Sequence, residues 1–110
     1  MEKVTLFHLE KPDIKISMEL YFNDNDQLYF DGYDIGKSVE AAWGDTDYEY
    51  SYTIESEEVD KFYQIFNLEQ GDKSGLLLSL KHRFSSDKAY SLLGDFMNAN
   101  HIIYSSFSWS

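Results

Sequence analysis

The fold is decided by the stretch from Asp47 to Asn67, DYEYSYTIESEEVDKFYQIFN. Its first eight residues alternate between polar side chains and aromatic or aliphatic ones, a period of two that is typical of a β-strand. The apolar members of this alternation are Tyr48, Tyr50, Tyr52 and Ile54. Further along, the apolar spacing becomes three and four residues, as on one face of a helix, at Val59, Phe62, Tyr63 and Phe66. The stretch therefore predicts a strand followed directly by a helix, with Ser56 as the helix N-cap.

The residues before Asp47 also carry strand patterns. Residues 4–9, VTLFHL, predict a short strand, and Pro12 separates it from the next one. Residues 14–22, IKISMELYF, alternate cleanly between apolar and polar side chains. Residues 23–26, NDND, are typical of a turn, because Asn and Asp tolerate left-handed backbone. Residues 27–33 then complete a hairpin.

The remaining elements are a loop, two helices and a strand. Residues 34–44 are expected to form a loop with one helical turn near its end. Residues 76–84 predict a short helix after the break GDKSG, and a third helix runs from an N-cap at Ser86 to about Asn98. An Asn in left-handed backbone is expected to end that helix. Residues 101–109, HIIYSSFSW, alternate again and predict a last strand.

The predicted order is therefore β-β-β-β-α-α-α-β within a single domain, residues 1–110. Strands grouped before helices indicate an α+β fold rather than a parallel, doubly wound sheet. We expect an antiparallel sheet of about five strands with about three helices packed on one face. The last strand returns to the sheet after the helices.

The negative charge of the chain is concentrated in one segment. The net charge is −11, and residues 24–60 hold twelve acidic residues against one basic residue, Lys37. The rest of the chain has eight acids and eight bases, and is neutral. Such a field repels nucleic acid and anionic membranes and attracts basic partners. Glu57, Glu58 and Asp60 have a structural explanation as well, because the helix dipole favours anions in the first turn.

Residue types that carry out catalysis are sparse and scattered. The chain has no cysteine, which excludes disulfides, thiol nucleophiles and thiolate metal sites. The three histidines are not clustered, and neither a nucleophile elbow nor a phosphate-binding glycine loop is present. Asp45, Asp47 and Glu49 could offer oxygen ligands to calcium, but the order of an EF-hand is not met. We expect no enzymatic activity, cofactor or metal; a small carboxylate enzyme with a divalent metal is the competing hypothesis.

No apolar run of signal-peptide or membrane-spanning length occurs in the sequence, so we expect a soluble cytoplasmic protein. Recognition of a partner is then the expected role. Trp43 stands in a loop beside carboxylates, the make-up of an interface anchor within an electrostatic rim, although it could equally close the edge of the core. The expected partner-binding residues are Trp43, Asp45, Asp47, Glu49, Asp24, Asp26, Asp31 and Asp34.

The run YDIGKSVEAAWGDTDYEYSYTI over residues 33–54, with a helix after it and HIIYSSFSW near the C-terminus, resembles small acidic bacterial immunity proteins. These belong to contact-dependent inhibition and other polymorphic toxin systems. The resemblance lies in size, acidity, order of elements and the G-D-x-D-Y-E-Y run. It implies a protein that neutralises a cognate toxin domain, commonly a nuclease with a basic cleft. The alternative is an acidic adaptor or regulatory module whose basic partner is not a toxin.

Overall fold

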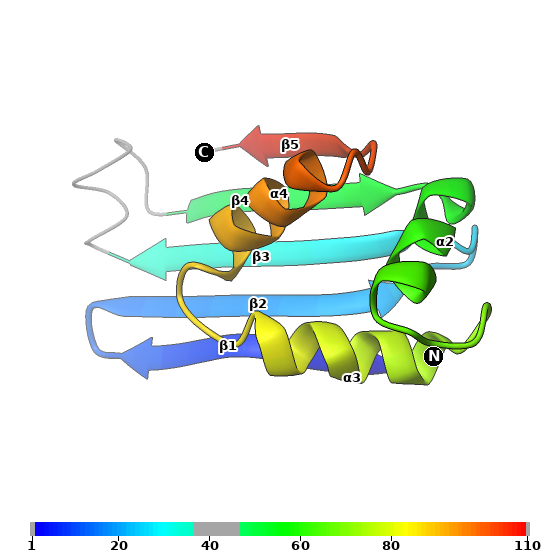
Figure 1. The fold of residues 1–110 in the computed structure, drawn as a ribbon. Helices are drawn as coiled ribbons and strands as arrows, with labels where there is room; N and C mark the ends of the chain where they lie inside the picture. The colour runs from blue at the N-terminus through cyan, green and yellow to red at the C-terminus, as the bar shows by residue number, and fades with distance from the viewer. Residues whose placement is uncertain (1, 37–46, 110) are drawn as a thin grey trace.

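A computed structural model describes residues 2–36 and 47–109 (Figure 1). The elements are β1 (Lys3–Lys11), β2 (Ile14–Phe22), β3 (Leu28–Gly36), β4 (Asp47–Ile54), α2 (Ser56–Ile65), α3 (Lys73–Arg83), α4 (Ala89–Ala99) and β5 (Ser105–Trp109). The predicted α+β class and the order β-β-β-β-α-α-α-β are confirmed.

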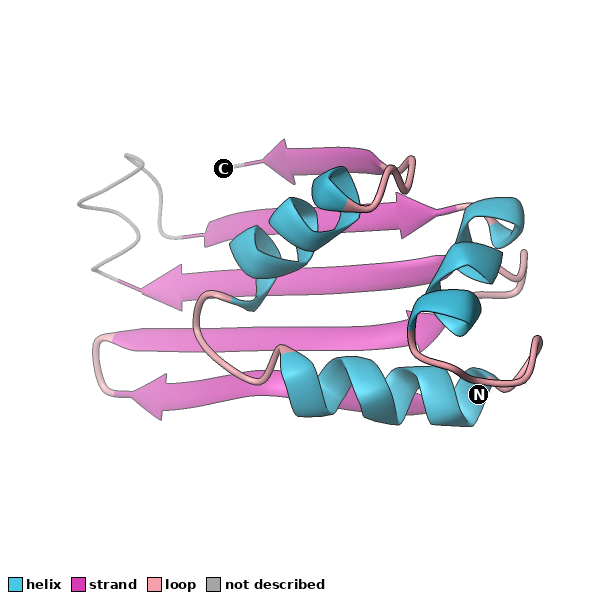
Figure 2. Cartoon of the chain, viewed as in Figure 1, coloured by secondary structure: helices cyan, strands magenta, loops and turns pink. Residues whose placement is uncertain are grey.

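The five strands form one antiparallel sheet in the order β1-β2-β3-β4-β5. The first four strands follow one another as neighbours, and β5 pairs with β4 after the chain has passed through the helices. The three helices of the described residues lie on the same side of the sheet (Figures 1 and 2). The opposite side carries no helix from the described part of the chain, and we call it the open face.

The core lies between the sheet and the helices. The alternation predicted for residues 14–22 is confirmed, because Met18, Leu20 and Phe22 are buried on the helix-covered side. The largest fully buried side chains come from both layers: Phe30, Phe62, Leu20, Leu28, Ile54, Leu76, Leu77, Leu80, Leu93 and Met97. Burying a side chain of this size stabilises the fold by about 1.5–3 kcal/mol relative to leaving it exposed.

The tyrosines of β4 connect the sheet to α4. Tyr50 and Tyr52 are buried on the helix-covered side, as the alternation predicts. The Tyr52 ring stacks on the Tyr90 ring with centroids 4.0 Å apart. The Tyr52 hydroxyl donates to the Tyr90 carbonyl oxygen at 2.8 Å, and the Tyr90 hydroxyl donates to the Ser51 carbonyl oxygen at 3.0 Å. Burial raises the pKa of both phenols, so they stay neutral donors.

Several predicted boundaries are wrong. β3 does not end at residue 33 but continues to Gly36, because Asp34 and Ile35 pair with β2 on one side and β4 on the other. α3 begins at Lys73, inside the expected break. The Asp72 carboxylate accepts a hydrogen bond from the Gly75 amide at 3.0 Å and caps this helix. The expected loop of residues 34–44 otherwise lies outside the described residues, as does its helical turn.

The expected caps of the other two helices also differ. Ser56 is the first residue of α2, and the N-cap is Glu55, which makes no side-chain cap hydrogen bond. α4 begins at Ala89 rather than next to Ser86, whose hydroxyl accepts from the Lys88 amide at 3.2 Å in the preceding turn. The left-handed residue after α4 is His101, not an asparagine. The last strand therefore starts later than expected and covers Ser105–Trp109.

Candidate protein-binding surface

The open face is an array of side chains in four rows that run across the strands. Directly opposed residues of antiparallel strands point to the same side, so the register of the strand pairs defines each row. The first row holds Glu10, Lys15, Ile35 and Asp47; the second His8, Ser17, Tyr33, Glu49 and Trp109; the third Thr5, Glu19, Asp31, Ser51 and Phe107; the fourth Lys3, Tyr21, Tyr29, Thr53 and Ser105.

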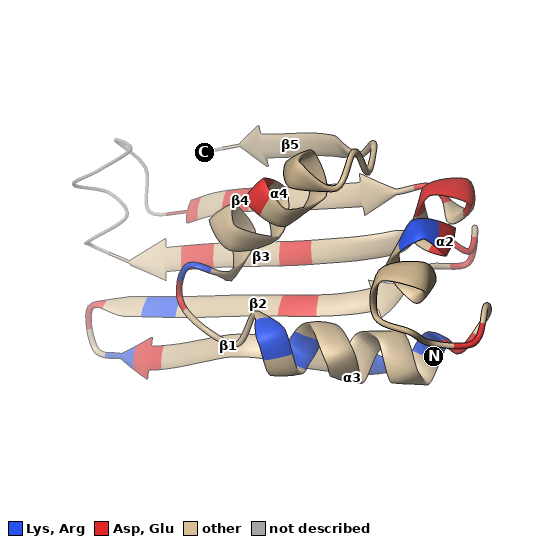
Figure 3. Ribbon diagram, in the orientation of Figure 1, with Lys and Arg blue, Asp and Glu red and all other residues tan. Residues whose placement is uncertain are grey.

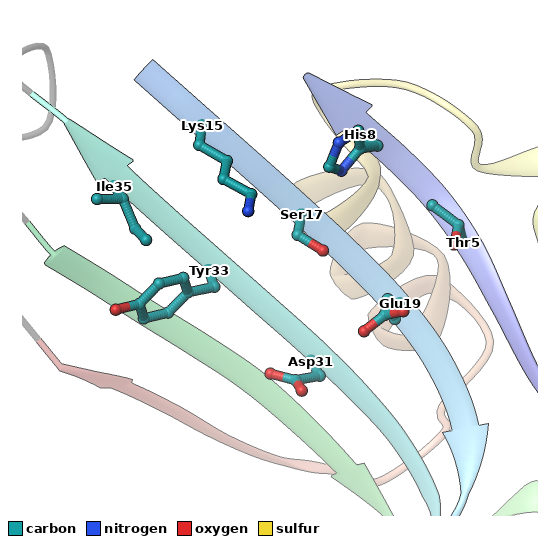
Figure 4. A pocket seen from close by; sticks show the side chains of 8 residues that line it. All are labelled: Thr5, His8, Lys15, Ser17, Glu19, Asp31, Tyr33 and Ile35. Carbon is teal, nitrogen blue, oxygen red and sulfur yellow. The ribbon is translucent and has the colours of Figure 1, made fainter. Parts of the chain in front are cut away.

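The part of the open face that β1, β2 and β3 form is hollowed. Figure 4 views the sheet from this side, with helices behind it. The hollow has a volume of about 540 Å³ and is open to solvent on one side. It is lined by Thr5, His8, Lys15, Ser17, Glu19, Asp31, Tyr33 and Ile35. A concave surface of this kind offers a partner more contact area than a flat sheet would.

Acidic residues outnumber basic ones on the open face. Five of the row residues are carboxylates and two are lysines, a net charge of −3. Glu19 and Asp31 stand directly opposite each other, an arrangement in which like charges destabilise a sheet. Lys3 offsets one of them, since its ammonium lies 3.5 Å from the Glu19 carboxylate. A positive group from a partner, placed over Asp31, would relieve the remaining repulsion.

Large aromatic side chains stand beside these carboxylates. Glu49 is flanked by Tyr33 on β3 and by Trp109 on β5. Trp109 is 55% exposed and Phe107 is 61% exposed, although both are large and apolar. Aromatic side chains next to an acid suit the binding of Arg or Lys, which the carboxylate attracts and the ring face accepts by a cation–π contact. Exposed apolar side chains grouped beside one another are also typical of an interaction surface.

Three of the expected partner-binding residues lie together on the open face. Asp31 and Glu49 are exposed, and Asp47 is half-buried at the start of β4. Asp24 and Asp26 are elsewhere, in the turn between β2 and β3, where Asp26 accepts a hydrogen bond from Lys73. Trp43 and Asp45 lie outside the described residues.

Asp34 lies on the other side of the sheet from Asp31. It is half-buried on the helix-covered side, where its carboxylate accepts a hydrogen bond from the Tyr50 hydroxyl at 2.7 Å. Burial raises the pKa of Asp34, and the hydrogen bond from Tyr50 opposes that shift. Burial of the phenol first, and the Asp34 carboxylate second, raise the pKa of Tyr50. Asp34 thus belongs to the core edge and does not contribute its charge to the open face.

Sequence reasoning did not select Glu19, Tyr33, Phe107 or Trp109. The alternation of residues 105–109 places the two aromatic residues of β5 on one side of a strand, but it does not say which side of the sheet that is. The pairing of Trp109 with Glu49 decides it.

A histidine and a serine also stand opposite each other on the open face. His8 stands opposite Ser17, and its Nε2 lies 3.7 Å from the Glu10 carboxylate. Residues 2–36 and 47–109 contain no group of three or more His, Asp or Glu side chains that could hold a metal ion. No helix in the described chain is long and apolar enough to cross a bilayer.

Comparisons with known proteins found no family model, no curated protein and no solved structure that matches this chain.

Proposed function

We propose that the protein is an immunity protein that binds and neutralises a basic toxin domain, and that the open face is its binding surface. The observation that carries this proposal is the second row of the open face, where Glu49 lies between Tyr33 and Trp109. This row borders the hollow that contains Glu19 and Asp31. The surface therefore combines aromatic anchors with a net negative charge.

Charge supports a basic partner. A nuclease cleft is positive because it binds phosphates. A protein with a net charge of −11 attracts such a cleft from a distance, and this steering raises the association rate. Figure 3 shows acidic residues on β2, β3 and β4 and also on α2 and α4, and basic residues on α3 and β2. The open-face carboxylates would add a local attraction for a basic partner.

The aromatic residues would supply the affinity that surface charges lack. Exposed ion pairs contribute about 0–1 kcal/mol each, so charge alone does not make a tight complex. Trp and Tyr are enriched among the residues whose truncation weakens a complex most. Trp109 and Tyr33 offer ring surface on both sides of Glu49, where an inserted Arg or Lys would contact rings and carboxylate together.

The proposal is tested by expressing the protein with the basic domain encoded by the gene immediately upstream. We expect that domain to arrest growth when it is expressed alone. We expect co-expression of this protein to restore growth, and the two purified proteins to form a complex. A complex with a domain that does not arrest growth would support the adaptor alternative instead. Failure to bind this domain, together with failure to protect, would contradict the immunity function.

A further inference from the structure

β5 is an edge strand without the usual protection. It is the last strand of the sheet and pairs with β4 along Ser105–Trp109. All five of its residues are exposed, including Ser106 and Ser108 on the helix-covered side, so no helix of the described chain covers this strand. Its sequence, SSFSW, contains neither a charged residue nor a proline, and its pairing with β4 runs without a register shift. No other described strand pairs with the outer backbone groups of β5, so among residues 2–36 and 47–109 they are open to a further strand.

The other edge of the sheet is protected in the ways that natural proteins use. The pairing of β1 with β2 shifts register between Thr5 and Phe7, and such a bulge bends an edge away from a flat partner. β1 also carries charged side chains along its length: Lys3, Glu10 and Lys11. α3 packs against β1 from the helix-covered side. The two edges of one sheet thus differ, which makes β5 the edge at which pairing is possible.

We propose that β5 pairs antiparallel with β5 of a second copy of this chain, across a two-fold axis at Phe107. This inference concerns a surface distinct from the hollow and does not rest on the proposed function. The register that uses all five residues places Phe107 opposite Phe107 of the second copy. It also places Trp109 opposite Ser105 of the second copy, and Ser106 opposite Ser108. The product is a continuous sheet of ten strands in which the two open faces lie side by side.

The second copy fits this edge because β5 is self-complementary. In the antiparallel register, the exposed Phe107 rings meet on the open face at 4.5–5.5 Å between Cβ atoms, as directly opposed residues do. Each Trp109 ring lies over a small Ser105 side chain, so the bulky residues do not collide. Both copies contribute the same five residues, which is the condition for a closed two-fold interface.

The charge distribution favours contact between two copies through β5 over contact through their acidic surfaces. Two molecules of net charge −11 repel each other, and β5 is a strand through which they can meet without opposed carboxylates. The nearest open-face carboxylate, Glu49, stands opposite Trp109, one strand in from the edge. In the paired sheet, Glu49 shares its row with Thr53 of the second copy, not with another acid. The β4 strands of the two copies are three strand spacings apart, about 14 Å, which exceeds the screening length of about 8 Å at physiological salt.

The interface is small, which fits a weak and reversible dimer. Pairing of five residues buries less surface than the roughly 1,200 Å² at which stable complexes begin. Salt should strengthen this dimer, because it screens the repulsion between two acidic molecules. Salt should weaken the binding of a basic partner to the open face, because it screens the attraction between opposite charges. The sign of the salt dependence therefore separates self-pairing from the proposed function.

Sedimentation equilibrium of the full chain tests the proposal. We expect the weight-average mass to rise from 12.9 kDa toward twice that value with protein concentration, and to rise further with salt. Phe107→Lys and Phe107→Glu should each stay monomeric, because each substitution places two like charges opposite each other at the two-fold axis. An equimolar mixture of these two variants should associate again. Leu78→Lys is the matched control, since Leu78 is equally exposed on α3 and lies away from β5; its mass should follow the unsubstituted chain.

Cross-linking provides a second measurement that does not depend on charge. The chain has no cysteine, so Phe107→Cys introduces a single thiol. We expect a short bis-maleimide to link Phe107→Cys into a dimer, and to leave Leu78→Cys monomeric. The proposal is overturned if the unsubstituted chain stays monomeric up to millimolar concentration in high salt. It is equally overturned if Leu78→Lys abolishes self-association while Phe107→Lys preserves it, because the dimer would then use the helices.

Discussion

Gly32 lies directly opposite Tyr50, and the Tyr50 ring fills the space that a side chain at Gly32 would need. A Cβ built at Gly32 would stand 2.0 Å from Cε2 of Tyr50. The ring lies across the glycine backbone and reaches Asp34 two residues further along β3, to which its hydroxyl donates. This glycine therefore permits the tyrosine layer that joins the sheet to α4.

Gly32→Ala is expected to destabilise the protein by about 1–3 kcal/mol, because the Tyr50 ring must leave its position and overpack the core. Urea unfolding measures the change. In a Tyr50→Ala background the ring is gone, so the same glycine substitution should cost much less. Equal losses in both backgrounds would show that the ring does not occupy this space.

Asp34→Asn is expected to leave the protein at least as stable at neutral pH. The raised pKa means that the folded state holds the Asp34 proton more tightly than the unfolded state. The free energy of unfolding therefore falls as the pH rises from the pKa of Asp34 in the unfolded state through its pKa in the folded state. The loss of stability persists at neutral pH. An asparagine oxygen can still accept from the Tyr50 hydroxyl without a charge to bury. Thermal unfolding against Asp24→Asn, an exposed site with the same change in charge, measures the effect; a lower melting temperature for Asp34→Asn would contradict it.

Glu58→Gln is expected to destabilise the protein at neutral pH but not in acid. The Glu58 carboxylate accepts from the Ile103 amide and from the Lys61 ammonium, each at 2.7 Å, and the bond from Ile103 ties α2 to the segment before β5. The Ile103 hydrogen bond first, and Lys61 second, lower the pKa of Glu58. The stability that these two contacts add is present above the pKa of Glu58 in the unfolded state. It is lost as the pH falls through the pKa of Glu58 in the folded state.

Melting temperatures recorded from neutral to acidic pH test this behaviour. The difference between Glu58→Gln and the unsubstituted chain should close as the pH falls below about 4.5. Glu57→Gln, in the same first turn of α2, is the control and should show a smaller difference. A gap between Glu58→Gln and the unsubstituted chain that stays constant over the whole pH range would contradict the assignment.

The sequence predicts the layers of this fold well where one face of an element is apolar. The alternation of residues 14–22 and 47–54 gives the buried face of each strand, because a strand can bury its apolar set in one orientation only. Prediction is weaker where tertiary pairing overrides local preference. Asp34 and Gly36 are poor strand formers, yet β2 and β4 hold Asp34 in β3 from both sides, and β2 holds Gly36 from one side. Because this pairing extends β3 through Asp34, Asp34 lies at the edge of the core and not at the rim of a binding surface.

Only some residues of the candidate surface can be predicted from the sequence. Asp31, Asp47 and Glu49 follow from the acidity of residues 24–60 and the parity of the strands. Trp109 comes from the other end of the chain, and its place beside Glu49 depends on the return of β5 to the sheet. Glu19 belongs to a neutral part of the sequence, and its position opposite Asp31 depends on the hairpin register. Such neighbours are set by long-range pairing, which local patterns do not encode.

The most direct test compares two variants of equal net charge. The first, Asp31→Asn/Asp47→Asn/Glu49→Gln, removes three carboxylates from the open face. The second, Glu57→Gln/Glu69→Gln/Asp87→Asn, removes three exposed carboxylates outside it. Stopped-flow mixing with the basic domain encoded upstream measures the association rate at low and physiological salt. We predict that the open-face variant associates about tenfold more slowly, with a flatter salt dependence, and that its control stays close to the unsubstituted chain. Equal rates for the two variants, or a slower control, would contradict the assignment of the open face as the binding surface.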